Sequence, residues 1–183
     1  SMNNQFTKKE APIQGFAGLG GGAVGRLLTS SGVALANRSL RFNDGDSTYL
    51  NRTPSSASNR KTWTWSAWVK RGALGIHQYL FSAGSASNYF ALSFDNNDKW
   101  QVDSYGTGAN AFYMHTGDML FRDTAAWYHL VAVLDTTQST GTNRFKLYVN
   151  GSQVDLTVGT NVPPEDADQL VNSTTEHRIG RIV

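Results

Sequence analysis

The stretch from Lys61 to Arg71 constrains the fold most strongly, because its side chains alternate in character with a period of two. On an extended chain, successive side chains point to opposite faces. One face of this stretch then carries Trp63, Trp65, Ala67 and Val69, and the other carries Thr62, Thr64, Ser66, Trp68 and Lys70. The pattern predicts an antiparallel strand with one face, including Trp63 and Trp65, buried in a core.

Turn signals at short intervals divide the chain from Ser39 onward into further strands. The sequence predicts strands over 79–83, 89–94, 100–105, 144–149, 153–156 and 178–183, and over 127–134 a core strand that is buried on both faces or packed centrally in a sandwich. Asp44-Gly45-Asp46 predicts a hairpin turn between strands 39–43 and 48–52, and Asn150-Gly151 predicts another. Many short strands separated by turns favour an all-β sandwich of two antiparallel sheets.

Residues 1–38 differ in composition from the predicted sandwich domain at 39–183. Glycines crowd one window, with large apolar side chains among them: Gly15, Phe16, Gly18, Leu19, Gly20, Gly21, Gly22, Val24, Gly25, Leu27 and Leu28. Such a density of glycine opposes a stable helix or central strand. Two interpretations stay open, a flexible linker and an arm that orders when it docks on another copy or a neighbouring protein. Ser1 before Met2 is interpreted as a remnant of tag removal.

Composition excludes several classes of function. The formal net charge is +2 and the basic residues are scattered, so the electrostatic footprint of a nucleic-acid partner is absent. The chain has no cysteine, which excludes disulfides, thiolate metal ligands and cysteine nucleophiles. No apolar run reaches about 18 residues, so no membrane insertion is expected.

Six motifs follow one another in an order that resembles a known family. They are Ser-Leu-Arg-Phe at 39–42, Tyr-Leu-Asn-Arg-Thr-Pro at 49–54, Asn-Arg-Lys-Thr-Trp-Thr-Trp-Ser-Ala-Trp-Val-Lys-Arg-Gly at 59–72, Ala-Trp-Tyr-His-Leu-Val-Ala-Val at 126–133, Asp-Thr-Thr-Gln at 135–138 and Asn-Arg-Phe-Lys-Leu-Tyr-Val-Asn-Gly-Ser-Gln-Val at 143–154. Together they resemble the concanavalin A-like, laminin G-like jelly-roll domains of bacteriophage virion and tail proteins, over residues 39–181.

This resemblance implies a non-enzymatic virion structural or tail-fibre-associated protein with a lectin-like domain that binds host-surface glycans. The alternatives are a decoration or cementing module without a ligand, and a polysaccharide-degrading enzyme. The implied location is extracellular, on the phage particle surface or tail, with other virion proteins or further copies as partners through the N-terminal arm. Members of the family continue past an Ile-Gly-Arg like residues 179–181, so we expect the chain to be truncated after Val183 or completed by another polypeptide.

Catalytic groups are sparse in the sequence. A retaining glycosidase needs two carboxyl groups about 5 Å apart, but Glu10, Glu165 and Glu176 share no predicted strand. No Gly-x-Ser-x-Gly motif occurs, and the four histidines lack metal-ligand spacing. His129 lies in a predicted core strand, where we expect a backbone or hydroxyl partner rather than a catalytic role.

Two kinds of binding site have candidate residues. If any metal binds, the resemblance implies calcium, with Asp44, Asp46, Asp95 and Asp98 as the oxygen donors, although both segments are also ordinary turn sequences. For carbohydrate, aromatic rings beside hydrogen-bonding groups suit a pyranose. The loop-rich region 100–115 supplies such a set, namely Trp100, Tyr105, Asn110, Tyr113 and His115, with core positions for Trp100 and Tyr113 as the alternative.

Overall fold

The computed structural model describes residues 39–106 and 111–183 of the chain, and Phe42–Val183 form one compact unit. The predicted arm at 1–38 and the candidate residue Asn110 lie outside the described residues. Within the described part, no helix is long and apolar enough to cross a membrane.

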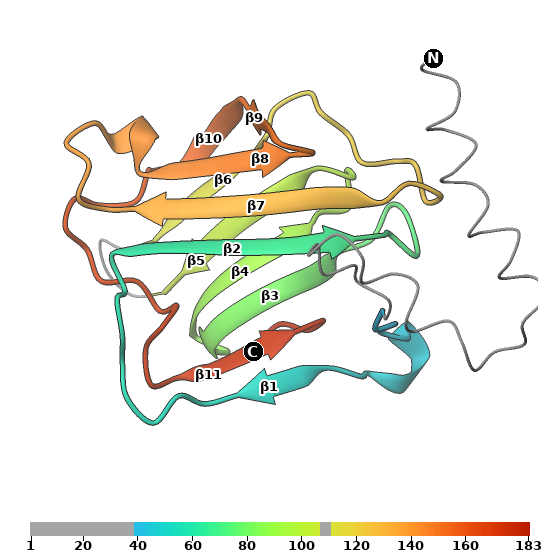
Figure 1. Cartoon of the computed structure of the whole chain (residues 1–183), viewed down its shortest axis with the longest axis horizontal. Coiled ribbons are helices and arrows are strands. Elements are labelled where there is room, and N and C mark those ends of the chain that lie inside the picture. The colour runs from blue at the N-terminus through green and yellow to red at the C-terminus, as the bar shows by residue number, and fades with distance from the viewer. Residues whose placement is uncertain (1–38, 107–110) are drawn as a thin grey trace, which may run out of the picture. The chain divides into compact units, whose positions relative to one another are not determined.

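Two antiparallel sheets stack face to face in this unit, and Figure 1 shows them as a front and a back layer. The seven-stranded sheet has the order β1-β11-β3-β4-β5-β6-β10. Its strands are β1 (Leu50–Arg52), β3 (Gln78–Ser85), β4 (Asn88–Phe94), β5 (Trp100–Tyr105), β6 (Phe112–Thr116), β10 (Leu156–Thr160) and β11 (Glu176–Ile179). The four-stranded sheet has the order β2-β7-β8-β9, with β2 (Thr62–Val69), β7 (Tyr128–Asp135), β8 (Phe145–Val149) and β9 (Ser152–Val154).

Aromatic side chains from the two inner faces fill the space between the sheets. The Trp63 ring of β2 meets Phe90 of β4 edge to face, with centroids 5.2 Å apart. The rings of Phe145 of β8 and Phe112 of β6 also meet across the sandwich, tilted by 53° with centroids 6.0 Å apart. Burial of these large rings is the main stabilising contribution in a chain without disulfides. The predicted all-β sandwich is therefore confirmed.

The alternation predicted between Lys61 and Arg71 is confirmed in β2. Trp63 and Trp65 pack against the core, whereas Thr64, Ser66 and Trp68 are exposed on the outer face. For β7 the central packing is confirmed, since the strand lies between β2 and β8, but only one face is fully buried, because buried and half-buried residues alternate along it. The continuous apolar run reflects the preference of β-branched residues for a central strand rather than a second covered face.

Other predicted boundaries needed correction. Asp44–Asp46 form a short 3₁₀-helix, η1, and β1 pairs with β11 from the far end of the chain instead of with 39–43. The predicted strand 153–156 is broken at Asp155, where the chain passes from β9 in one sheet to β10 in the other. The last strand covers Glu176–Ile179 and ends before Gly180, whose φ is +88°. The Asn150-Gly151 turn is confirmed, with φ values of +51° and +86°.

Candidate functional site

The outer face of the seven-stranded sheet gathers four tyrosines around one carboxylate. Strands β3, β4, β5 and β6 each supply one ring, and we call the set the tyrosine face: Tyr79, Tyr89, Tyr105 and Tyr113 with Asp103. Cross-strand register brings them together, since Tyr89 pairs with Tyr105 and Asp103 pairs with Tyr113. Adjacent residues such as Phe90, Val102 and Phe112 point inward and are buried, so the same alternation that builds the core presents these groups outward.

Hydrogen bonds and ring stacking hold one half of the tyrosine face in place. The Tyr89 hydroxyl donates to Asp103 Oδ2 at 3.0 Å. The Tyr89 and Tyr105 rings stack with centroids 5.5 Å apart and an angle of 26° between their planes. Tyr105 is 57% exposed, so one ring of this stack is open to solvent. This half therefore offers a fixed aromatic surface beside a carboxylate.

A second chain of contacts orders the neighbouring half. The Tyr113 hydroxyl donates to Gln101 Oε1 at 3.0 Å, and Gln101 Nε2 donates to Ser93 Oγ at 3.1 Å. The His115 ring lies 5.6 Å from the Tyr113 ring. Because Ser93, Gln101 and His115 are register partners on three adjacent strands, this polar row crosses the sheet beside the tyrosines.

Partial burial changes the protonation behaviour of these groups. Desolvation raises the pKa of Asp103, and the hydrogen bond from Tyr89 and the charge of His77 oppose that rise. Desolvation, followed by the charge of Asp103, also raises the pKa values of Tyr79 and Tyr89. For Tyr113 desolvation again raises the pKa most. The hydroxyls of Tyr79, Tyr89 and Tyr113 therefore stay protonated in ordinary buffers and can both donate and accept hydrogen bonds.

Three of the residues predicted for sugar binding, Tyr105, Tyr113 and His115, lie together on this face. Trp100 does not, because it is 0% exposed and its ring points into the core 6.5 Å from that of Trp65. The predicted loop region also contains strand β6, whose Phe112 and Met114 are buried while Tyr113 and His115 face outward.

Sequence reasoning missed Tyr79, Tyr89, Gln101 and Asp103 as site residues. A signal for two of them exists, since Gln101, Asp103 and Tyr105 occupy alternate positions of one predicted strand and must share a face. Tyr79 and Tyr89 reach the site only because β3 and β4 lie next to β5, which is a property of the sheet order.

Two acidic residues of the seven-stranded sheet and its turns, Glu176 and Asp95, lie far from Asp103. Glu176 lies on β11, three strands away from β5, which corresponds to about 14 Å at the usual strand spacing. Asp95 lies four residues along the strand from Ala91, the register partner of Asp103, which corresponds to about 13 Å. Both separations exceed the range of about 5–9.5 Å found between paired carboxyl groups of glycosidases.

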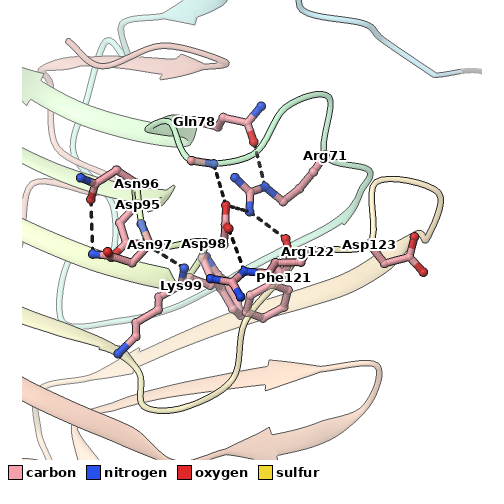
Figure 2. A network of polar contacts seen from close by, with 12 residues as sticks. Arg71, Gln78, Asp95, Asn96, Asn97, Asp98, Lys99, Phe121, Arg122 and Asp123 are labelled. Atoms are coloured by element: carbon pink, nitrogen blue, oxygen red, sulfur yellow. Dashed lines mark hydrogen bonds and ion pairs between the residues drawn. The ribbon is translucent and has the colours of Figure 1, made fainter.

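The calcium candidate Asp98 is the centre of a buried ion-pair network, which Figure 2 shows. Asp98 Oδ1 accepts from Arg71 Nη1 at 2.8 Å and from the Gly75 amide at 2.9 Å, and Oδ2 accepts from Arg122 Nε at 3.1 Å. The side chains of Arg71 and Asp98 are 0% and 8% exposed. The Gly75 amide first, then the two arginines, lower the pKa of Asp98 despite its burial.

These contacts do not fit a calcium ion, because two guanidinium groups already neutralise the carboxylate. Asp95 is also engaged, since its Oδ1 accepts the amides of Asn97 and Lys99 at 2.9 and 2.7 Å in a tight turn. Asp46 accepts from the Asn43 side chain at 2.7 Å. Within the described part of the chain, no three His, Asp or Glu side chains are grouped as metal ligands.

His129 has the hydroxyl partner expected of a structural histidine. Its Nε2 lies 3.0 Å from Ser66 Oγ, and its ring stacks on Trp68 with centroids 5.1 Å apart. The predicted core strand and the predicted hydroxyl contact are both confirmed, and the two rings lie on the outer face of the four-stranded sheet.

The seven-over-four sandwich with ordered aromatic and polar groups on one outer face defines a lectin-like jelly-roll domain. The family model described as the concanavalin A-like lectin/glucanases superfamily matches residues 44–181, and the chain belongs to this superfamily. A solved structure similar to the chain is the native heptameric SAP-like pentraxin from Limulus polyphemus, at 16% identity and a TM-score of 0.48, covering 72% of this chain and 56% of the pentraxin. The chain thus spans little more than half the length of that protein. No curated protein matches the sequence.

Proposed function

We propose that this chain is a non-enzymatic, lectin-like domain of a bacteriophage virion that binds host-surface glycans through the tyrosine face. The observation that carries the proposal is the joint presentation of a solvent-open tyrosine stack and the Asp103 carboxylate on one rigid sheet. A pyranose offers an apolar face of C–H groups to an aromatic ring and hydroxyls to polar side chains. The tyrosine face supplies both partners at fixed positions.

Preorganisation favours binding at this surface over the other exposed aromatics. Strands hold the backbone of every residue on the tyrosine face, and hydrogen bonds orient the Tyr89 and Tyr113 rings. The side chains then lose little conformational entropy when a sugar binds. This favours binding, because the contacts of a weakly bound ligand contribute too little free energy to offset a large entropy loss.

The virion context rests on the resemblance of three motifs to phage proteins, Arg-Thr-Pro at 52–54, Trp-Val-Lys-Arg-Gly at 68–72 and Asp-Thr-Thr-Gln at 135–138. We place the domain on the particle surface or the tail, with other virion proteins or further copies as partners. The non-enzymatic assignment is supported by the separation of Asp103 from Glu176 and Asp95, which leaves it without a partner for acid and base catalysis.

We expect Tyr105→Ala to weaken glycan binding about two- to thirteenfold, because one aromatic contact contributes about 0.5–1.5 kcal/mol. The matched control is Trp68→Ala, which removes an exposed aromatic ring from the other sheet. A glycan array identifies the ligand, and isothermal titration of the wild type and both variants measures the affinities.

Two results of that experiment would contradict the proposal. Absence of saturable binding on a broad array would leave a decoration or cementing module without a ligand. Release of reducing sugar from host polysaccharide, measured on the same preparation, would assign the domain to the polysaccharide-degrading members of the fold.

A further inference from the structure

Strand β2 is an edge strand without the usual protection against pairing. It spans eight residues at the margin of the four-stranded sheet, and its sequence Thr-Trp-Thr-Trp-Ser-Ala-Trp-Val contains no charge, proline or glycine. The edge strands at the other three margins of the described sheets have features that disfavour pairing with a further strand. Strands β1 and β9 have three residues each, and the pairing of β10 is interrupted by a bulge between Val158 and Thr160. Edge strands that must stay unpaired are normally short, charged or bulged.

A row of backbone groups on β2 faces away from its neighbour. Among the described strands β2 pairs with β7 alone, in an antiparallel register that joins Thr62 to Asp135 and Val69 to Tyr128. The Thr136 amide donates to the Lys61 carbonyl at 2.9 Å, so the odd-numbered residues of β2 exchange hydrogen bonds with β7. The N–H and C=O groups of Thr64, Ser66 and Trp68 therefore point to the free edge.

The core is also open on this side. On β7 the inner-face residues Leu130, Ala132 and Leu134 are at most 1% exposed. On β2 the corresponding residues, among them Trp63 and Trp65, are only partly buried. In a closed sandwich the next strand of the sheet would cover these rings.

The seven-stranded sheet extends past β2 and leaves a surface for such a strand. Trp63 and Trp65 of β2 pack on Phe90 of β4 and Trp100 of β5, so β3, β11 and β1 lie beyond the last strand of the other sheet. Figure 1 shows β11 and β1 outside the front layer. Their inner faces form an apolar shelf made of the register partners Leu50, Ile179 and Phe81, of which Leu50 and Ile179 are 47% and 44% exposed.

We propose that β2 is a docking site for one extended segment of another polypeptide, which adds to the four-stranded sheet as a further strand. Main-chain hydrogen bonds to Thr64, Ser66 and Trp68 would provide the affinity, as in other cases of strand addition. Alternate side chains of the segment would face the apolar shelf, so these must be apolar and uncharged. The remaining side chains would lie beside Ser66 and Trp68 and can be polar.

The shape of the site favours a lone strand over a second copy of this domain. Antiparallel pairing of two β2 strands places both seven-stranded sheets on the same side of the joined sheet. Each extends three strands past its own β2, so the two would occupy the same space. A segment without a second layer behind it meets no such obstruction.

Amide exchange measured by NMR on the full chain tests this proposal. The probe is a synthetic peptide of about nine residues that alternates valine with threonine and carries a lysine at each end. We expect the amides of Thr64, Ser66 and Trp68 to exchange rapidly in the free protein. At a probe concentration ten times its dissociation constant, their exchange should slow about tenfold.

Two controls separate backbone pairing from unspecific adsorption. A probe N-methylated at alternate residues lacks half of its donors and should give no protection. Thr64→Pro removes one edge donor without removing a bond to β7 and should weaken binding, whereas Thr64→Val keeps the donor and should bind normally. Equal protection by both probes would overturn the proposal. Protection of Thr64 and Ser66 before any probe is added would also overturn it, since residues 1–38 or a second copy would then already cover the edge.

Discussion

Replacing Asp98 with asparagine is expected to lower the free energy of unfolding by about 3–5 kcal/mol, because it leaves the buried Arg71 guanidinium without its counter-charge. Asparagine keeps the shape of the side chain and tolerates the positive φ of this position, +65°, so the loss reports the charge itself. The substitution should also weaken contacts outside the turn that contains Asp98. Asp98 joins the loop at Gly75 to the loop at Phe121, whose amide donates to the Asp98 carbonyl at 2.8 Å.

The pH dependence of this contribution has a definite sign. The pKa of Asp98 is lowered in the folded protein, so its contribution is complete above the ordinary aspartate pKa of about 3.9 and is lost as the pH falls through the folded value. Urea unfolding at pH 7 should therefore separate wild type and Asp98→Asn clearly, and the difference should shrink in acid.

The matched control for Asp98→Asn is Arg122→Gln. Arg122 contacts the same carboxylate but its side chain is exposed, so its loss should cost less than about 1 kcal/mol. Equal losses for the two variants, or a difference that stays constant in acid, would contradict a buried Arg71–Asp98 pair.

Trp100→Ala should also lower the free energy of unfolding by about 3–5 kcal/mol, since it opens a large cavity in the core. The Trp100 ring contacts those of Trp65 and Phe121 at 6.5 Å between centroids. Urea unfolding followed by circular dichroism measures the loss, and titration with glycan under folding conditions should give a wild-type affinity. Tyr105→Ala should instead weaken glycan binding and leave the free energy of unfolding unchanged. Weakened binding with unchanged stability in Trp100→Ala would instead make Trp100 a sugar platform.

Local patterns predicted the strands of this fold better than their partners. The alternation from Lys61 to Val69 depends only on neighbouring residues, and it specifies the buried face of β2 correctly. The pairing of Leu50–Arg52 with Glu176–Ile179 joins distant parts of the chain, and no local signal indicates it. The Asp44-Gly45-Asp46 sequence is compatible with a hairpin turn as well as with a 3₁₀-helix. In the structure it forms the 3₁₀-helix, because residues 50–52 pair with β11 and not with the residues that precede the turn.

The same distinction between local alternation and strand pairing explains which residues of the candidate site could be predicted from the sequence. Tyr105 and Asp103 share a face through their spacing, which the sequence shows. Their association with Tyr89 requires β4 to lie beside β5 in a particular register, and a shift of one residue would turn Tyr89 into the core. Trp100 is aromatic and close to the site in sequence, but its position in the alternation places its ring inside the core.

Two of the motifs that carry the family resemblance contain residues that stabilise the fold of this domain. Arg71, from Trp-Val-Lys-Arg-Gly, is the buried partner of Asp98. Asp135, from Asp-Thr-Thr-Gln, accepts hydrogen bonds from Thr137 and Gln138, which lower its pKa and fix the turn after β7. Both motifs therefore stabilise the fold, and the glycan contacts that we propose lie on the tyrosine face.

The most direct test of that assignment is NMR of the full chain with ring-labelled tyrosine, titrated with a glycan retained on the array. The chain has seven tyrosines, so each ring can be followed separately. We predict that the signals of Tyr105, Tyr89 and Tyr113 shift on titration, whereas those of Tyr128 and Tyr148 on the four-stranded sheet do not. Shifts confined to Tyr128 or Tyr148, with the tyrosine face unchanged at saturation, would contradict the account.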